Sequence, residues 1–276
     1  GLESWVNFIS ISGANQGIGR AIAEDLAQKG HRVFATAPTE SERQSLLGLS
    51  ENIIPLLLDL RSKEHIEELR TSVAQQTDHL DGLINNAGIA MGGPVEILDV
   101  DAIRNLFEIN VFGHIKMTQT FLPLLRKAKQ ARIVFTGSAA GIFVRPLLGG
   151  YAASKFALTA FCDALRVELK PQKIRVSLIQ PGRIKTPIWS TPPNESIQNH
   201  PNAEPYRVAI DKLQQEAEEN AVASPPVSLV TKAMNHALFS NYPKAQYLVG
   251  FDAHIAYWFG ILPSFIVDKL LIRLFF

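Results

Sequence analysis

Short apolar runs alternate with longer stretches of helical spacing over the first two thirds of the chain, and this alternation constrains the fold more than any other feature. Runs without polar alternation are typical of strands buried on both faces, and they occupy residues 6–11, 33–37, 53–58, 82–85, 132–136 and 175–180. Helical spacing fills the intervals, for example at 21–29 and 63–76. Because neighbouring parallel strands need crossover helices, the pattern predicts an α/β fold with a three-layer, doubly wound parallel sheet.

No internal repeat or low-complexity linker interrupts this order, so we expect residues 1–276 to form a single domain. Residues 187–226 break the pattern, because they are rich in Pro, Asn, Glu and Gln. They contain one predicted helix from Glu204 to about Ala223, with a single apolar stripe formed by Tyr206, Ile210, Leu213 and Ala217. We interpret 187–226 as an insertion that covers a substrate crevice, with a surface ornament of no function as the alternative.

The C-terminal segment 251–276 is unusually apolar and aromatic for the end of a soluble domain. Its uncharged run, residues 253–267, is too short to span a bilayer. Three roles remain open: an interfacial membrane anchor, a subunit contact, or a flap over the substrate entrance, and we favour the subunit contact. The first residues do not show the pattern of a secretory signal peptide, so we expect a cytoplasmic protein, with peripheral membrane contact as the alternative.

Composition argues against several kinds of partner. The 27 Lys and Arg residues nearly balance the 26 Asp and Glu residues, so no strong field draws in nucleic acid. The single cysteine, Cys162, cannot form an internal disulfide. The seven histidines form no metal-ligating motif, and no metal is predicted.

Three glycines, Gly13, Gly17 and Gly19, stand between the first predicted strand and the first predicted helix. Glycines allow a tight turn and a close approach of the backbone to a pyrophosphate, while the helix N-terminus supplies free N–H groups. The turn therefore predicts a site for an anionic ligand, and we expect a nucleotide.

Tyr151 and Lys155 are four residues apart in a segment of helical spacing, so they share one face of a helix. A nearby ammonium favours the phenolate, which helps a tyrosine of ordinary pKa near 10 to exchange protons near neutrality. Chance also produces such pairs, so this spacing alone does not decide for catalysis.

The motif SGANQGIG resembles the cofactor turn of the short-chain dehydrogenase/reductase family, with Ser12 in place of the usual Thr. Further motifs of that family follow in its order: LLLDL, NNAG, INVFG, GSAAG, YAASK and PGRIKT. The resemblance covers roughly residues 5 to 190 and implies a Rossmann fold. The stretch from Arg145 to Pro171 looks like the branch that handles retinoids and steroids.

The resemblance implies four catalytic residues, Asn110, Ser138, Tyr151 and Lys155. Tyr151 would be the general acid or base, Ser138 would hold the substrate oxygen, Lys155 would lower the tyrosine pKa and hold the ribose, and Asn110 would position a water. The cofactor-binding residues it implies are Gly13, Asn15, Gln16, Gly17, Ile18, Gly19, Asp59, Leu60, Asn86, Ala87, Gly88, Tyr151, Lys155, Pro181, Gly182, Ile184 and Thr186.

The choice between NAD(H) and NADP(H) depends on the segment after the second strand. Ala37 occupies the position of an NAD-type acid, which would accept a hydrogen bond from the ribose 2′-hydroxyl, and Pro38 occupies the position of an NADP-type arginine. The absence of the acid favours NADP(H) slightly over NAD(H). Thr39, Ser41 and Arg43 remain candidates for a phosphate site, and Glu40 or Glu42 for a ribose contact.

The resemblance therefore implies an NAD(P)-dependent oxidoreductase that interconverts an apolar alcohol and its ketone or aldehyde. Candidates for an apolar substrate wall are Ile142, Phe143, Leu147, Leu148, Ile188 and Trp189. A non-catalytic NAD(P)-binding regulator and, less favoured, a sugar-nucleotide epimerase or dehydratase are the alternatives. Association into a homodimer or homotetramer through the helices of Asn110 and Tyr151 is expected by the same resemblance.

Overall fold

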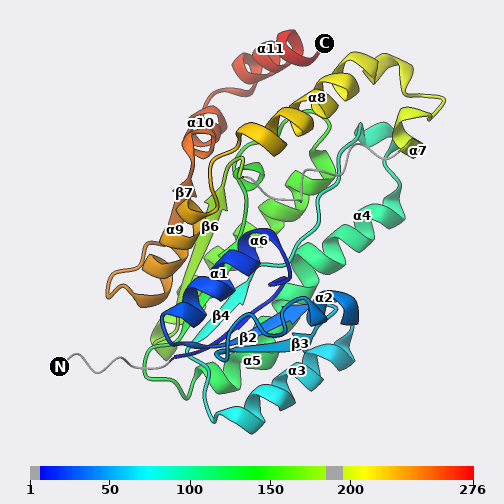
Figure 1. Ribbon diagram of the computed structural model, residues 1–276. Helices are drawn as coiled ribbons and strands as arrows, with labels where there is room; N and C mark the ends of the chain where they lie inside the picture. The colour runs from blue at the N-terminus through cyan, green and yellow to red at the C-terminus, as the bar shows by residue number, and fades with distance from the viewer. Residues whose placement is uncertain (1–6, 185–194) are drawn as a thin grey trace.

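A seven-stranded, fully parallel sheet forms the centre of the molecule, which we describe from a computed structural model over residues 7–184 and 195–276 (Figure 1). The strand order is β3-β2-β1-β4-β5-β6-β7. The strands are β1 (Phe8–Ile11), β2 (Arg32–Ala37), β3 (Ile53–Leu57), β4 (Gly82–Asn85), β5 (Arg132–Thr136), β6 (Arg175–Pro181) and β7 (Gln246–Val249). Six of them match the apolar runs in the sequence, and β7 was not predicted.

Helices cover both faces of the sheet, which confirms the predicted three-layer arrangement. The helices are α1 (Gly17–Gln28), α2 (Glu40–Gln44), α3 (Lys63–Gln76), α4 (Val100–Phe107), α5 (Gly113–Leu125), α6 (Gly149–Glu168), α7 (Glu195–Gln198), α8 (Arg207–Ala223), α9 (Ser228–Phe239), α10 (Phe251–Gly260) and α11 (Ser264–Phe275). Helices α1 and α9 pack on one face, and α3, α5 and α6 pack on the other. Because each face is covered, β4 and β5 are buried at every residue, which explains their continuous apolar sequences.

A smaller apolar cluster lies beyond the carboxyl edge of the sheet, where α8 and α11 run side by side (Figure 1). Ile210 of α8 and Phe275 of α11 are both buried in it, together with Leu98 and Leu147. The predicted helix from Glu204 is present as α8, preceded by a 3₁₀ turn at Glu204–Tyr206. Of the stripe predicted on it, Tyr206 and Leu213 also pack against this cluster.

The chain reverses its direction of winding at β1, which pairs with β2 on one side and β4 on the other. Connections from the two strands diverge at such a switch point and leave a crevice at the carboxyl ends of the strands. The fold therefore places a ligand site between the loops that follow β1 and β4. No helix among the described residues is long and apolar enough to cross a membrane.

Candidate active site

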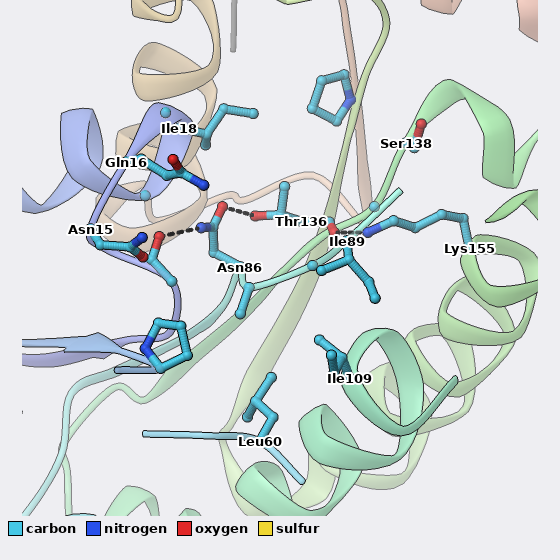
Figure 2. A pocket seen from close by; sticks show the side chains of 18 of the residues that line it. Asn15, Gln16, Ile18, Leu60, Asn86, Ile89, Ile109, Thr136, Ser138 and Lys155 are labelled. Carbon is cyan, nitrogen blue, oxygen red and sulfur yellow. Dashed lines mark hydrogen bonds between the residues drawn. The ribbon is translucent and has the colours of Figure 1, made fainter. Parts of the chain in front are cut away.

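A cleft of about 300 Å³ opens at this switch point, and nearly all of the predicted site residues line it (Figure 2). They are Gly13, Asn15, Gln16, Gly17, Ile18, Gly19, Asp59, Leu60, Asn86, Ala87, Gly88, Ser138, Tyr151, Lys155, Pro181, Gly182 and Ile184. Of the remaining two, Asn110 is buried next to the cleft, and Thr186 lies outside the described residues. The sequence analysis did not assign Pro38, Leu58, Arg61, Ile89, Ile109, Thr136 or Gly137, which also line the cleft.

The glycine turn needs its glycines. Gly13 and Gly17 have φ angles of +68° and +55°, which side chains disfavour. A Cβ on Gly19 would lie 2.0 Å from the carbonyl oxygen of Gly13. The Gln16 side chain does not cap α1, so the first N–H groups of the helix remain available for an anionic ligand at the cleft. This cradle fits the pyrophosphate of a dinucleotide.

Ser12 supplies a hydroxyl at the position where the family usually has Thr. Its Oγ accepts hydrogen bonds from the backbone N–H groups of Asn86 (2.9 Å) and Ala87 (3.0 Å). The Asn86 side chain in turn donates to the Gly13 carbonyl (3.3 Å) and accepts from the Thr136 hydroxyl (3.0 Å) (Figure 2). The ends of β1, β4 and β5 are thus held together by side chains of the motifs.

Asn110 lies in a π-helical turn, Glu108–Phe112, inserted between α4 and α5. Such turns often occur at functional sites. The Asn110 amide accepts a hydrogen bond from Ile89 N–H and donates one to Ile89 C=O, both at 2.9 Å, and it also donates to Ser154 Oγ at 3.1 Å. Asn110 therefore joins the loop after β4 to α6, and its expected role in positioning a water stays a prediction.

His114, a buried side chain of α5, contacts the same loop and was missed by the sequence analysis. Its Nε2 lies 2.7 Å from the Ala87 carbonyl oxygen, a distance at which the ring N–H donates to that oxygen. Complete burial lowers the pKa of His114 to about 3, so the ring is neutral. A single histidine in a helix carries no spacing signal that could have identified it.

Tyr151, Ser138 and Lys155 come together at one end of the cleft. Tyr151 is buried and hydrogen-bonded to Ser138; burial raises the pKa of its phenol to about 12, against the lowering effect of that bond. Lys155 Nζ donates to the Thr136 carbonyl at 3.2 Å and lies 5.7 Å from the centre of the Tyr151 ring. Burial lowers the pKa of Lys155 to about 8.

The pKa of Tyr151 thus differs from the sequence expectation, in which Lys155 lowers it. Burial disfavours the charged form of both groups, and for the phenol it outweighs the stabilising contacts. With these pKa values, Tyr151 is a neutral proton donor near pH 7, and Lys155 is close to the pH range in which it titrates.

A second cavity of about 380 Å³ adjoins the cleft and shares Ser138 and Gly182 with it. Apolar side chains from four segments form its wall: Phe143, Leu148, Leu213, Ala217, Ile255, Ala256, Phe259, Leu271 and Leu274. Of the predicted wall residues, Phe143 and Leu148 line it, Ile142 and Leu147 do not, and Ile188 and Trp189 lie outside the described residues. An ion pair between Arg145 and Glu216, at 2.5 Å, adds a polar group.

The sequence was compared with models of known families, and the short chain dehydrogenase model matches residues 7–196. The chain belongs to the short-chain dehydrogenase family. A 3β-hydroxysteroid dehydrogenase of Caenorhabditis elegans, dhs-16, is 31% identical over 99% of this chain and 76% of its own length. Retinol dehydrogenase 5 of mouse is 32% identical over 96% of this chain and 87% of its own length. The predicted resemblance to oxidoreductases of retinol and steroid type is therefore confirmed at the level of the family.

Solved structures of short-chain dehydrogenases share the fold. A Burkholderia phymatum member in complex with NAD superposes with a TM-score of 0.78 at 23% identity, covering 94% of each chain. A Burkholderia cenocepacia member in complex with NADP gives a TM-score of 0.75 at 22% identity, covering 98% of this chain and 99% of that one. Both confirm the predicted Rossmann-type architecture.

Proposed function

We propose that this short-chain dehydrogenase transfers hydride between a nicotinamide dinucleotide and an apolar alcohol or its ketone or aldehyde. The observation that carries the proposal is the meeting of two cavities at Ser138, beside Tyr151. One cavity contains the glycine turn and the N-terminus of α1, and the other has a largely apolar wall. A substrate oxygen near Ser138 would lie between the two.

Each side chain has a definite task in this proposal. The nicotinamide ring, when bound, supplies or accepts the hydride. Ser138 Oγ donates a hydrogen bond to the substrate oxygen and holds it beside the Tyr151 hydroxyl. In the reductive direction Tyr151 gives its proton to that oxygen as the carbon receives hydride, and in the oxidative direction it removes the proton. Lys155 supplies positive charge near the resulting phenolate, and its hydrogen bond to Thr136 fixes its position.

The second cavity supports the proposed class of substrate. Its apolar wall suits a bulky hydrocarbon skeleton, and its volume lies in the range of small-molecule pockets. The two relatives named above act, by their names, on retinol and on 3β-hydroxysteroids. We therefore propose a steroid-, retinoid- or lipid-like alcohol.

We further infer that the cleft prefers NAD(H), which reverses the preference predicted from Ala37. Glu42 of α2 lines the cleft, and its carboxylate accepts hydrogen bonds from Asn15 (3.1 Å) and from Thr39 (2.7 Å). Arg43, considered above as a phosphate ligand, instead forms an ion pair with Glu40. Glu42 lies five residues beyond Ala37, the position of an NAD-type acid, and α2 brings its carboxylate to the same cleft. A 2′-phosphate there would meet a carboxylate.

The decisive test is Tyr151→Phe, which deletes one hydroxyl and leaves the ring. We expect turnover of steroid and retinoid alcohols to fall by at least about a hundredfold, while calorimetry shows nearly unchanged binding of the nicotinamide cofactor. Unchanged turnover in this variant would reject Tyr151 as the acid or base. If the wild type binds cofactor but turns over no alcohol or ketone in a broad panel, the non-catalytic alternative replaces the proposal.

A further inference from the structure

A separate cleft, of about 850 Å³, lies far from both cavities described above. It is at the amino ends of β5 and β6, on the sheet edge opposite the candidate active site. Six cationic side chains line it: Lys129, Arg132, Arg166, Lys170, Lys173 and Arg175. No Asp or Glu is among the described residues that line it. The whole chain has a formal net charge of only +1, so this is a local concentration of positive charge.

Two of these cations are direct neighbours in the sheet. Arg132 is the first residue of β5, Arg175 is the first residue of β6, and the two are register partners. Like charges directly opposite on adjacent strands destabilise a sheet. Placing these two positive charges side by side therefore costs free energy of folding, and an anion bound between the guanidinium groups would remove this cost.

Arg132 is also buried without a matching negative charge among the described residues. The residue is only 4% exposed; its guanidinium donates to the Ser240 carbonyl at 3.1 Å and to Gln130 Oε1 at 3.4 Å, and its Nε has no hydrogen-bond partner within the described chain. Burial and the charge of Arg175 lower the pKa of Arg132. A buried charge without a counter-ion is expensive, and proteins usually pair it.

The remaining cations are placed to reach a ligand from the rim. Lys170 and Lys173 are exposed on the 3₁₀ turn that follows α6, and neither forms an ion pair with the described residues. Arg166 is paired with Asp163, so it contributes less charge. Val167, Ile174 and Val176 add apolar surface to the wall.

We propose that this cleft binds the phosphate groups of an organic polyphosphate. Guanidinium groups match phosphate oxygens with paired hydrogen bonds, and two lysines add charge without fixed geometry. The apolar part of the wall would accommodate the organic portion of the ligand, and the volume is that of a small-molecule site. The site is independent of the candidate active site, because the two lie at opposite ends of the same strands.

Inorganic tripolyphosphate serves as the probe, with thermal unfolding of the full chain as the readout. A ligand that binds only the folded state stabilises it, so we expect the melting temperature to rise by roughly 5 °C at about a hundred times Kd, relative to sodium chloride of equal ionic strength. The double variant Lys173→Ser/Arg175→Ser should lose most of this rise. Lys232→Ser, which removes an exposed lysine of α9 outside the cleft, should keep it.

Arg132→Met tests whether a lost response to tripolyphosphate could result from misfolding instead of from loss of the site. Because it replaces an unpaired buried charge by an apolar side chain of similar size, we expect it to melt no lower than the wild type without the probe. It should also respond little to tripolyphosphate. Equal stabilisation of the wild type and the Lys173/Arg175 variant would overturn the proposal and indicate binding elsewhere, for example at the glycine turn. A wild type that responds no more to tripolyphosphate than to chloride would overturn it as well.

Phosphate groups reach proteins on free molecules or on lipid headgroups, and sedimentation with vesicles separates these sources. If the headgroup is the source, adding phosphatidylinositol bisphosphate to phosphatidylcholine vesicles should sediment more of the wild type than phosphatidylcholine alone, and the Lys173/Arg175 variant should lose this increase. If a free polyphosphate is the source, the thermal shift persists and the added lipid sediments no more of either protein. An equal increase in sedimentation of both proteins together with equal thermal shifts would count against the site.

Discussion

At the scale of single residues, burial controls the protonation of the proposed catalytic group. Lys155 has its pKa lowered to about 8, because the folded protein takes its ammonium out of water. The unfolded chain keeps this proton up to about pH 10.4, so between about pH 8 and 10 the unfolded state binds more protons than the folded state. The contribution of Lys155 to the free energy of unfolding therefore rises with pH in this window. Above about pH 10 the buried Tyr151, whose pKa is about 12, acts in the opposite direction.

Lys155→Met tests directly how much free energy of folding is lost by burying the Lys155 ammonium. The variant should be inactive, yet more stable than the wild type at pH 7, by roughly 1–3 kcal/mol in the free energy of unfolding. Denaturant titrations at several pH values measure the difference, which should shrink from pH 8 to 10. A variant that is less stable than the wild type at pH 7 would show that the hydrogen bond to Thr136 outweighs the burial of the charge.

Cofactor preference is also decided by one side chain in this proposal. A carboxylate near a 2′-phosphate repels it by roughly 1–4 kcal/mol, depending on the separation and the solvent exposure. The wild type should therefore bind NAD(H) at least about tenfold more tightly than NADP(H), and Glu42→Gln should remove most of this difference. Fluorescence titration of both reduced cofactors measures it. Glu40→Gln is the matched control, because Glu40 pairs with Arg43 and does not line the cleft.

Most residues that line this cleft could be singled out from the sequence, because they belong to local motifs. Gly13, Asn86 and Tyr151 each follow or begin an element, and a parallel sheet brings the carboxyl ends of its strands to one edge. Glu42 remained one of several candidates, because its place depends on how the loop after β2 leads into α2. The pKa of Tyr151 could not be predicted either, since burial depends on all the elements packed around it.

At the scale of elements, the last helix forms part of the second cavity, the proposed substrate site. Leu271 and Leu274 of α11 line this cavity, and Phe275 is 1% exposed, with the cations of Arg145 and Lys212 at 5.2 and 5.3 Å from its ring centre. Of the three roles considered for the C-terminal segment, these contacts support the flap over the substrate entrance, which we propose for the inner face of α11. The sequence analysis favoured the subunit contact instead, because an apolar tail has no periodicity that identifies its partner.

Phe275→Ala should loosen this wall. Removing a buried phenylalanine side chain costs roughly 3–5 kcal/mol in a rigid core, and less at a chain end that can yield. We expect KM for a steroid or retinoid alcohol to rise about tenfold or more, with a smaller effect on a short alcohol and on cofactor binding. Phe276→Ala, at an exposed position, is the control. Equal effects of the two substitutions would separate α11 from substrate binding.

At the scale of the whole molecule, we distinguish two sets of exposed apolar side chains as two surfaces. The first is defined by Phe112, which directly precedes α5, and by Phe156 and Phe161 of α6, which also carries Tyr151. The other covers α10 and α11 and includes Trp258 and Phe265, which are 64% and 74% exposed. Exposed apolar patches mark contacts with proteins or membranes. The sequence indicated the helix of Tyr151, but it predicted neither α10 and α11 nor the side chains left uncovered, because coverage depends on the assembled fold.

We propose that the first surface joins subunits and that the second contacts lipid. Phe156→Glu/Phe161→Glu should convert a dimer or tetramer into monomers, since buried like charges at a symmetric contact repel. Light scattering measures the molar mass of the oligomer, and Trp258→Ser/Phe265→Ser should leave this mass unchanged.

A second assay, the binding of neutral phosphatidylcholine vesicles, should be affected by the serine variant and not by the glutamate variant. Apolar side chains that insert at a lipid surface lose affinity when they become polar, so Trp258→Ser/Phe265→Ser should reduce binding about tenfold or more. The glutamate variant of α6 should retain it. If the serine variant instead dissociates the oligomer, the C-terminal surface is the subunit contact favoured by the sequence, and the assignment of the two surfaces is reversed.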